Sequence, residues 1–255
     1  MTRPWLAVML MGLLVVMGYG SNVEASAILA ITDTSGGSAG CDNSQAFTAT
    51  NCGAGFVTAL NSSSIIFSGS VGGFTLGLVA VAGNQPGNTT AGNVLDGKFN
   101  VLHASGTGNL QVDFGGNNFS LPVGPGLFLS ASDSGTWGQS QATDTQGFQS
   151  WGRADNALTI PGGTATAIAP PCTPGAGLTT SCSAATVDVP FARGAGNYSL
   201  TGRETITQST LDTLAASYTA SVAANSQPTR VPEPASVVLL GTGILVLAGI
   251  AARRK

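Results

Sequence analysis

Apolar and polar residues alternate in several short stretches of this chain, and stretches rich in glycine, proline and asparagine separate them. The clearest alternation runs from Leu214 to Ala224, where apolar residues take every second position and Ser217, Thr219 and Ser221 take the opposite face. A two-residue period is typical of a β-strand with one buried face. No long apolar pattern of helical period occurs between residues 28 and 235. The pattern therefore predicts an all-β domain.

A second alternating stretch predicts a hairpin. Residues 110–114 alternate, Gly115-Gly116-Asn117-Asn118 is expected to be a turn, and residues 119–123 alternate again. Further strands are expected at residues 64–67, 74–81, 99–103, 127–132, 187–191 and 198–208. This many strands, punctuated by 36 glycines and 12 prolines, predicts two packed antiparallel sheets over residues 28–224, as a jelly-roll-like β-sandwich.

The first residues have the three parts of a secretory signal. Arg3 supplies the positive charge, Trp5 to Met17 is apolar, and Ala25-Ser26-Ala27 offers the small residues that a signal peptidase accepts. We expect residues 1–27 to be a signal peptide that is cut after Ala27, with a cut after Ala25 as the alternative. An uncleaved anchor is the competing interpretation, but the apolar stretch is shorter than the ~18 residues that a membrane span requires.

The four cysteines form two local pairs, which in an exported chain favours disulfides. Three connectivities are formally open, and we prefer Cys41 with Cys52 and Cys172 with Cys182. A zinc site is not expected, because neither pair has the spacing of zinc ligands and His103 is the only histidine. We expect neither a metal nor a cofactor.

The charges of the domain are few and scattered. Residues 28–230 carry five basic side chains, at Lys98, Arg153, Arg193, Arg203 and Arg230. Phosphate binding requires clustered Lys and Arg, so nucleic acid is not an expected partner.

Enzyme signatures are weak. Gly36-Gly37-Ser38-Ala39-Gly40 matches a nucleophile elbow only by pattern, because the strand before it and the helix after it are not predicted. Asp96-Gly97 and Asp133-Ser134-Gly135 are expected to be turns. The acids that could serve a glycosidase are expected to be solvated turn residues; they are Asp133, Asp144, Asp155 and Asp188. We therefore expect no enzyme.

The carboxyl end has a different composition. Residues 225–231 are expected to be a polar linker, and residues 235–252 carry no charge. As a helix this uncharged stretch is about 27 Å long, close to the hydrocarbon thickness of a bilayer. The stretch therefore predicts a transmembrane helix, with the basic residues Arg253, Arg254 and Lys255 on the cytoplasmic side and the domain exported.

The order Val231-Pro232-Glu233-Pro234-Ala235-Ser236, then an apolar span, then a basic end, resembles the PEP-CTERM sorting signal of exported bacterial proteins. The resemblance covers residues 232–255. It implies an exosortase, a membrane-embedded processing enzyme, as a partner, with Pro232, Glu233 and Pro234 as the recognition residues. It also implies a transient hold at the inner membrane, followed by release to the cell surface or the extracellular matrix.

These observations predict a non-enzymatic surface or matrix protein with a structural or adhesive role. The alternative is a carbohydrate module that binds or cleaves exopolysaccharide, with Trp137, Trp151 and Tyr198 available to stack on sugar rings. A third interpretation is a permanently anchored surface protein that is never processed.

Overall fold

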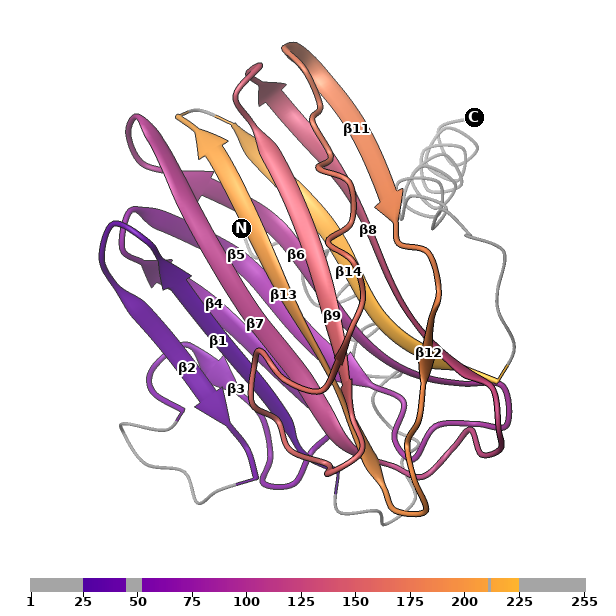
Figure 1. The fold of residues 1–255 in the computed structure, drawn as a ribbon. Coiled ribbons are helices and arrows are strands. Elements are labelled where there is room, and N and C mark those ends of the chain that lie inside the picture. The colour runs from indigo at the N-terminus through magenta and orange to yellow at the C-terminus, as the bar shows by residue number, and fades with distance from the viewer. Residues whose placement is uncertain (1–24, 45–51, 211, 225–255) are drawn as a thin grey trace, which may run out of the picture.

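The computed structural model describes residues 25–44, 52–210 and 212–224, which form fourteen β-strands in two packed sheets (Figure 1). The strands are β1 (Ala27–Asp33), β2 (Ser38–Asp42), β3 (Phe56–Val57), β4 (Ser64–Val71), β5 (Phe74–Gly83), β6 (Ala91–His103), β7 (Thr107–Phe119), β8 (Leu127–Ser140), β9 (Thr145–Arg153), β10 (Thr164–Ala165), β11 (Gly177–Ala185), β12 (Val189–Phe191), β13 (Tyr198–Ser209) and β14 (Thr213–Ala223).

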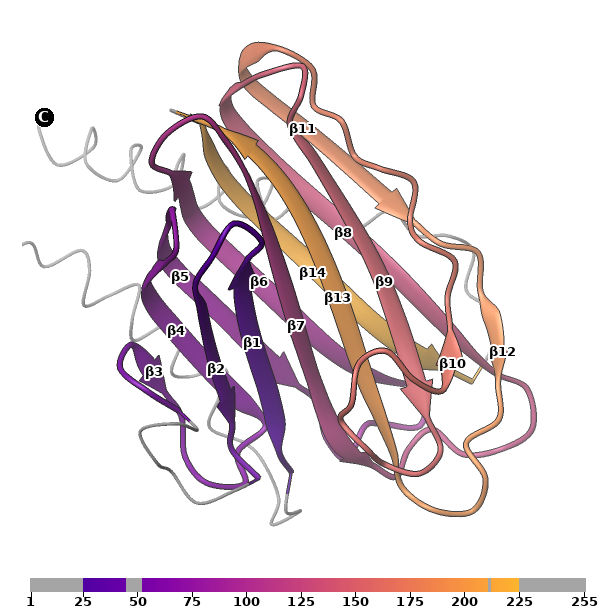
Figure 2. The same ribbon diagram turned by 60° about the vertical axis from the view of Figure 1, so that its left-hand side comes forward.

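The two sheets face each other as layers (Figure 2). The smaller sheet has the order β10-β9-β13-β7-β1-β2, and the larger has the order β11-β8-β14-β6-β5-β4-β3, with β12 paired to β8. Every strand pairing is antiparallel. The all-β antiparallel architecture is thus confirmed, while the jelly-roll connectivity stays a prediction.

The core lies between the sheets and is built from the alternating positions. In β14, Leu214, Tyr218 and Val222 are buried, as the two-residue period predicts. The Tyr218 ring meets the Phe148 ring of the smaller sheet, with centroids 5.5 Å apart. Aromatic contacts of this kind add to the free energy gained by removing each ring from water.

The predicted hairpin at residues 110–123 is wrong. Strand β7 continues through Gly115 and Gly116 to Phe119, and both glycines pair with β1 and β13. A Cβ atom at Gly116 would lie 2.2 Å from Gln85 Nε2, and one at Gly115 would lie 2.6 Å from Thr201 Cγ2. These glycines therefore make room for buried side chains inside a strand rather than forming a turn.

Both disulfides join the two sheets at their lateral edges. The structure pairs Cys41 with Cys52 and Cys172 with Cys182, the two local pairings preferred from the sequence. Cys41 lies in β2, the edge of the smaller sheet, and Cys52 precedes β3, the edge of the larger sheet.

At the other side, Cys182 lies in the edge strand β11 of the larger sheet. The backbone of Cys172 bonds to Gln146 of β9 in the smaller sheet, with N···O distances of 2.8 and 3.0 Å. The interior is therefore closed by a covalent bond at both open sides of the sandwich.

Candidate functional site

The predicted sorting residues lie outside the described residues. These are Pro232, Glu233, Pro234, Arg253, Arg254 and Lys255, together with the predicted linker at 225–231 and the predicted helix at 235–252. Residues 1–24 of the predicted signal peptide lie outside as well. Among the residues that the structure describes, no helix is long and apolar enough to cross a bilayer.

The three aromatic residues considered for sugar stacking are buried. Trp137 and Tyr198 have no exposed surface, and Trp151 is 6% exposed. The Tyr198 hydroxyl donates to the Leu121 carbonyl at 2.7 Å, so its polar atom is also used internally. The hypothesis of an aromatic platform formed by these residues is therefore wrong, because a sugar ring cannot reach them.

His103 and Ser38 come from different strands, β6 and β2. Ser38 pairs with Thr32 in the hairpin of β1 and β2, whose turn contains Gly36 and Gly37. A strand, not a helix, thus follows the glycines. His103 is half-buried at the end of β6, its ring centroid 4.6 Å from that of Phe74 and its Nδ1 atom 3.4 Å from the Gly106 carbonyl oxygen.

Two of the four candidate acids are buried, contrary to expectation. Asp133 and Asp144 have no exposed surface. The predicted turn at Asp133 is wrong, because this residue lies inside β8 and accepts a hydrogen bond from Gln146 Nε2 of the opposite sheet at 3.0 Å. Burial raises the pKa of Asp133 to about 6, and the Gln146 bond opposes this rise.

The other two acids remain accessible. Asp155 is exposed and pairs with Arg153, whose guanidinium lowers the pKa of the carboxyl to about 2. Asp188 is half-buried between β11 and β12. The four candidate acids are therefore divided between two buried and two accessible positions, and they do not form one shared surface site.

The described residues instead contain a buried charge cluster that sequence reasoning missed. We call Asp96, Lys98 and Glu204 the central charge cluster. Asp96 and Lys98 project from β6 in the larger sheet, and Glu204 projects from β13 in the smaller sheet. The Lys98 amine forms ion pairs with both carboxyls, and the three side chains have no exposed surface.

The expected turn at Asp96-Gly97 concealed this cluster. Strand β6 runs through both residues, and the two-residue period then places Asp96 and Lys98 on the same inward face. The signal in the sequence is the spacing of an acid and a lysine two residues apart inside an alternating apolar stretch. Glu204 could not be assigned to them from the sequence, because it comes from a distant strand.

Burial determines the charge state of this cluster. Burial raises the pKa of the Glu204 carboxyl well above its usual range, and the nearby Asp96 raises it further, while Lys98 opposes the rise. The pKa of Lys98 is raised by Asp96 and Glu204 despite the opposing effect of burial. Burial and the neighbouring Asp96 therefore favour a proton on Glu204, and the two carboxyls favour the charged form of Lys98.

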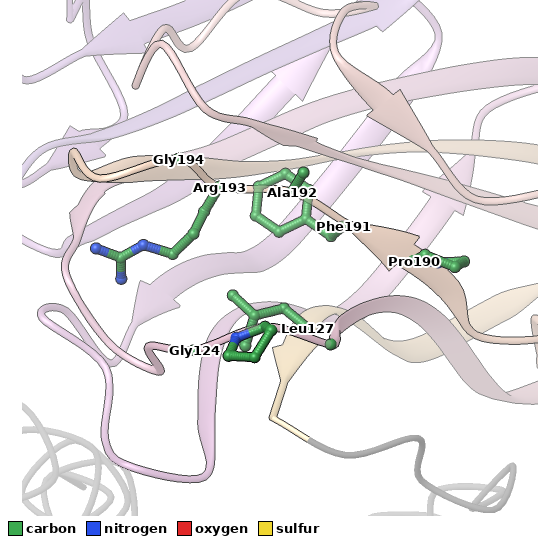
Figure 3. Close-up of a pocket in the computed structure, with 9 residues that line it drawn as sticks. Gly124, Leu127, Pro190, Phe191, Ala192, Arg193 and Gly194 are labelled. Carbon is green, nitrogen blue, oxygen red and sulfur yellow. The ribbon is translucent and has the colours of Figure 1, made fainter.

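A surface cleft lies between the start of β8 and β12 (Figure 3). Its lining includes Leu127, Pro190, Phe191 and Arg193. Arg193 extends away from Pro190 in Figure 3, and its Nη1 donates to the carbonyls of Ser120 and Pro122. The guanidinium is thus committed to the fold, and the cleft offers mainly apolar and backbone surface.

The described residues contain no group of three or more His, Cys, Asp or Glu side chains arranged to hold a metal ion. The carboxyl pairs that the fold does form, Asp96 with Glu204 and Asp144 with Asp212, have no exposed surface. A soluble polysaccharide cannot contact acids in that position.

The comparison with protein families matches the carboxyl end of the chain. Residues 230–255 match the PEP-CTERM protein-sorting motif. The chain carries this sorting motif. The motif confirms the resemblance seen in the sequence, and it implies export, processing by an exosortase and membrane-associated sorting to the cell surface.

The other comparisons add little. No curated protein matches the chain. A solved structure titled "Structure of infectious bursal disease virus Gx strain" aligns with 84% of this chain at 10% identity and a TM-score of 0.26. The chain spans 55% of the length of that viral chain. This likeness is too low to support an argument about fold or function.

Proposed function

We propose that this protein is a structural component of the bacterial surface or extracellular matrix, without catalytic activity of its own. The observation that carries the proposal is the PEP-CTERM sorting motif at residues 230–255. The motif supports delivery through the inner membrane, a transient hold by the segment at 235–252 and processing at Pro232-Glu233-Pro234. The β-sandwich is then the part that is displayed.

The features of the sandwich agree with a structural role. Asp133, Asp144 and the three candidate aromatic residues are buried, and the cysteines in the described part of the chain are paired in disulfides. Disulfides persist in oxidising compartments outside the cytoplasm. A fold with buried reactive groups and covalent ties at both edges is suited to persistence in an external environment.

The test is the mass of the mature protein in a host that has an exosortase. We expect a carboxyl terminus near Pro234 in the wild type and loss of this processing when Pro232, Glu233 and Pro234 are replaced by alanine. Gln227→Ala, in the linker before the motif, is the matched control and should be processed normally. An intact Lys255 on the mature wild-type protein would contradict the proposal and would favour a permanent anchor.

A further inference from the structure

The burial of a lysine and two acids in the central charge cluster is not explained by the stability of an ion pair. The chain has two lysines, Lys98 and Lys255, so the one lysine of the sandwich lies at its centre with no exposed surface. Replacing a buried ion pair by apolar residues of similar volume is often neutral or stabilising. Conformational stability alone therefore gives no reason for a lysine and two acids at this place.

The hydrogen bonds of the cluster are also incomplete. Asp96 Oδ1 and both carboxyl oxygens of Glu204 lack a hydrogen-bond partner, and so does the hydroxyl of Tyr218. The Lys98 amine lies 4.8 Å from the centre of the Tyr218 ring. Buried polar atoms without partners are costly in free energy, so a rearrangement that removes these charges is favourable.

The geometry brings an amine against a carboxyl group. Lys98 Nζ donates a hydrogen bond to Asp96 Oδ2. It also contacts Glu204 Oε2, but the angles of this contact are not those of a hydrogen bond. Since Oε2 is bonded to Cδ, the nitrogen also lies close to that carbon. Reacting groups fixed in contact react far faster than the same groups in dilute solution.

We propose that the Lys98 amine and the Glu204 carboxyl condense to a buried amide that joins the two sheets, with Asp96 as the group that accepts the amine's proton. The ammonium first gives one proton to the Asp96 carboxylate. The neutral amine then attacks Glu204 Cδ, the Nζ–Cδ bond forms, the Cδ–OH bond breaks, and the hydroxyl leaves with a second amine proton as water. Asp96 ends as a neutral acid, and the product holds no buried charge.

The charge states already described fit this step. Burial and Asp96 raise the pKa of Glu204 well above its usual range, which favours the neutral acid, whose hydroxyl can leave as water. Asp96 contacts the amine directly and is in position for general acid-base transfer. After the reaction, the protonated Asp96 can donate a hydrogen bond to the new amide oxygen.

A tryptic map of the reduced and unfolded wild-type protein tests the bond. Trypsin should fail to cut between Lys98 and Phe99, because the lysine side chain is acylated. It still cuts between Arg203 and Glu204, so the peptide that begins at Glu204 should appear joined to the peptide that contains Lys98. The joined mass should be one water less than the sum of the two. A free peptide ending at Lys98 together with a free peptide beginning at Glu204 would overturn the proposal.

Two other reactions lose the same mass, and the map separates them. A succinimide at Asp96-Gly97, or an amide between Asp96 and Lys98, also releases one water. In both cases the peptide beginning at Glu204 would be recovered free. That outcome would overturn the proposed bond.

Variants test the role of each partner. Lys98→Arg keeps the positive charge but cannot form this amide. Its mature protein should therefore show no loss of one water from the mass calculated for its sequence. Asp96→Asn keeps both partners and removes the proton acceptor, so the joined fraction should fall at least about tenfold. Full joining in Asp96→Asn would overturn the role given to Asp96. The disulfide pattern of each variant reports whether it folds, and the wild-type map decides the bond in either case.

Discussion

Asp144 and Asp212 lie carboxyl to carboxyl at one end of the sandwich, and neither has exposed surface. Asp144 precedes β9 and accepts backbone hydrogen bonds from Gln141 at 2.5 Å and from Ser209 at 2.9 Å. Both oxygens of Asp212, in the connection between β13 and β14, lack such donors. Despite its burial, hydrogen bonds to Asp144 lower its pKa, whereas burial and Asp144 raise that of Asp212, so a shared proton is favoured on Asp212.

This pair predicts that stability falls as the pH rises. Burial and the neighbouring Asp144 raise the pKa of Asp212 from 3.8 to about 7 in the fold. The contribution of Asp212 to stability is therefore complete below pH 3.8 and is lost as the pH rises through about 7. Asp133, with its pKa raised to about 6, acts in the same direction. The lowered pKa of Asp144 acts in the opposite direction, since its contribution is lost as the pH falls.

Asp212→Asn should flatten this dependence, because the amide carries no charge at any of these pH values. Urea unfolding at about pH 5 and about pH 8 should show a smaller loss of unfolding free energy in the variant than in the wild type. Equal slopes in the wild type and in Asp212→Asn would contradict the shared proton.

The Cys172–Cys182 bond should stabilise the fold by restricting the unfolded chain. It closes a loop with a sequence separation of 10 and ties β11 to the segment beside β9. Replacing both cysteines by serine should lower the unfolding free energy by about 3 kcal/mol. Urea unfolding under non-reducing conditions measures this loss. An unchanged midpoint would show that the bond does not contribute to the unfolding free energy.

Gly202 should not tolerate a methyl group. A Cβ atom there would lie 2.6 Å from Phe148 and 2.7 Å from Phe114, in the stack of these two rings. Gly202→Ala should therefore cost about 1–3 kcal/mol through overpacking. Gly97→Ala is the matched control, since a Cβ atom at this strand position meets nothing within 4 Å. Similar thermal unfolding of the two variants would refute this account.

The structure favours the earlier of the two predicted signal-peptide cuts. The Ser26 backbone nitrogen donates to Asn117 Oδ1 at 3.1 Å, and that of Ala27 donates to Asn43 Oδ1 at 2.8 Å. A cut after Ala27 would remove both donors from the fold, whereas a cut after Ala25 keeps them. We therefore expect Ser26 as the first residue of the mature protein. Amino-terminal sequencing checks this, and a mature chain that begins at Ile28 would refute it.

The strands with a polar outer face could be predicted from the sequence. The alternating stretch that begins at Leu214 forms most of β14, because one face meets the core and the other is more open to solvent. The buried strand positions that carry glycine or a charged residue could not be predicted in this way. Gly115 and Asp96 have the local chemistry of turns, yet both lie in long strands. Thr201 of a distant strand occupies the space beside Gly115, and Lys98 of the same strand pairs with Asp96. The partner of Gly115 is set by tertiary packing and leaves no local pattern.

The sorting motif was readable because its three parts are contiguous. The central charge cluster was not, because Glu204 reaches Lys98 only after β13 packs over β6. A single sequence holds no information that pairs these two positions. The sorting motif at the carboxyl end could therefore be recognised from the sequence, whereas the central charge cluster between the sheets could be found only in the structure.

The placement of the two disulfides has a mechanical consequence. Strand β1 belongs to the smaller sheet, and β14, which leads toward the carboxyl-terminal segment, belongs to the larger sheet. The start of β1 and the end of β14 lie at the same end of the sandwich, so tension applied between them would pull the two layers apart at that end. Covalent ties on both flanks oppose that separation together, so neither layer can pivot about a single fixed edge.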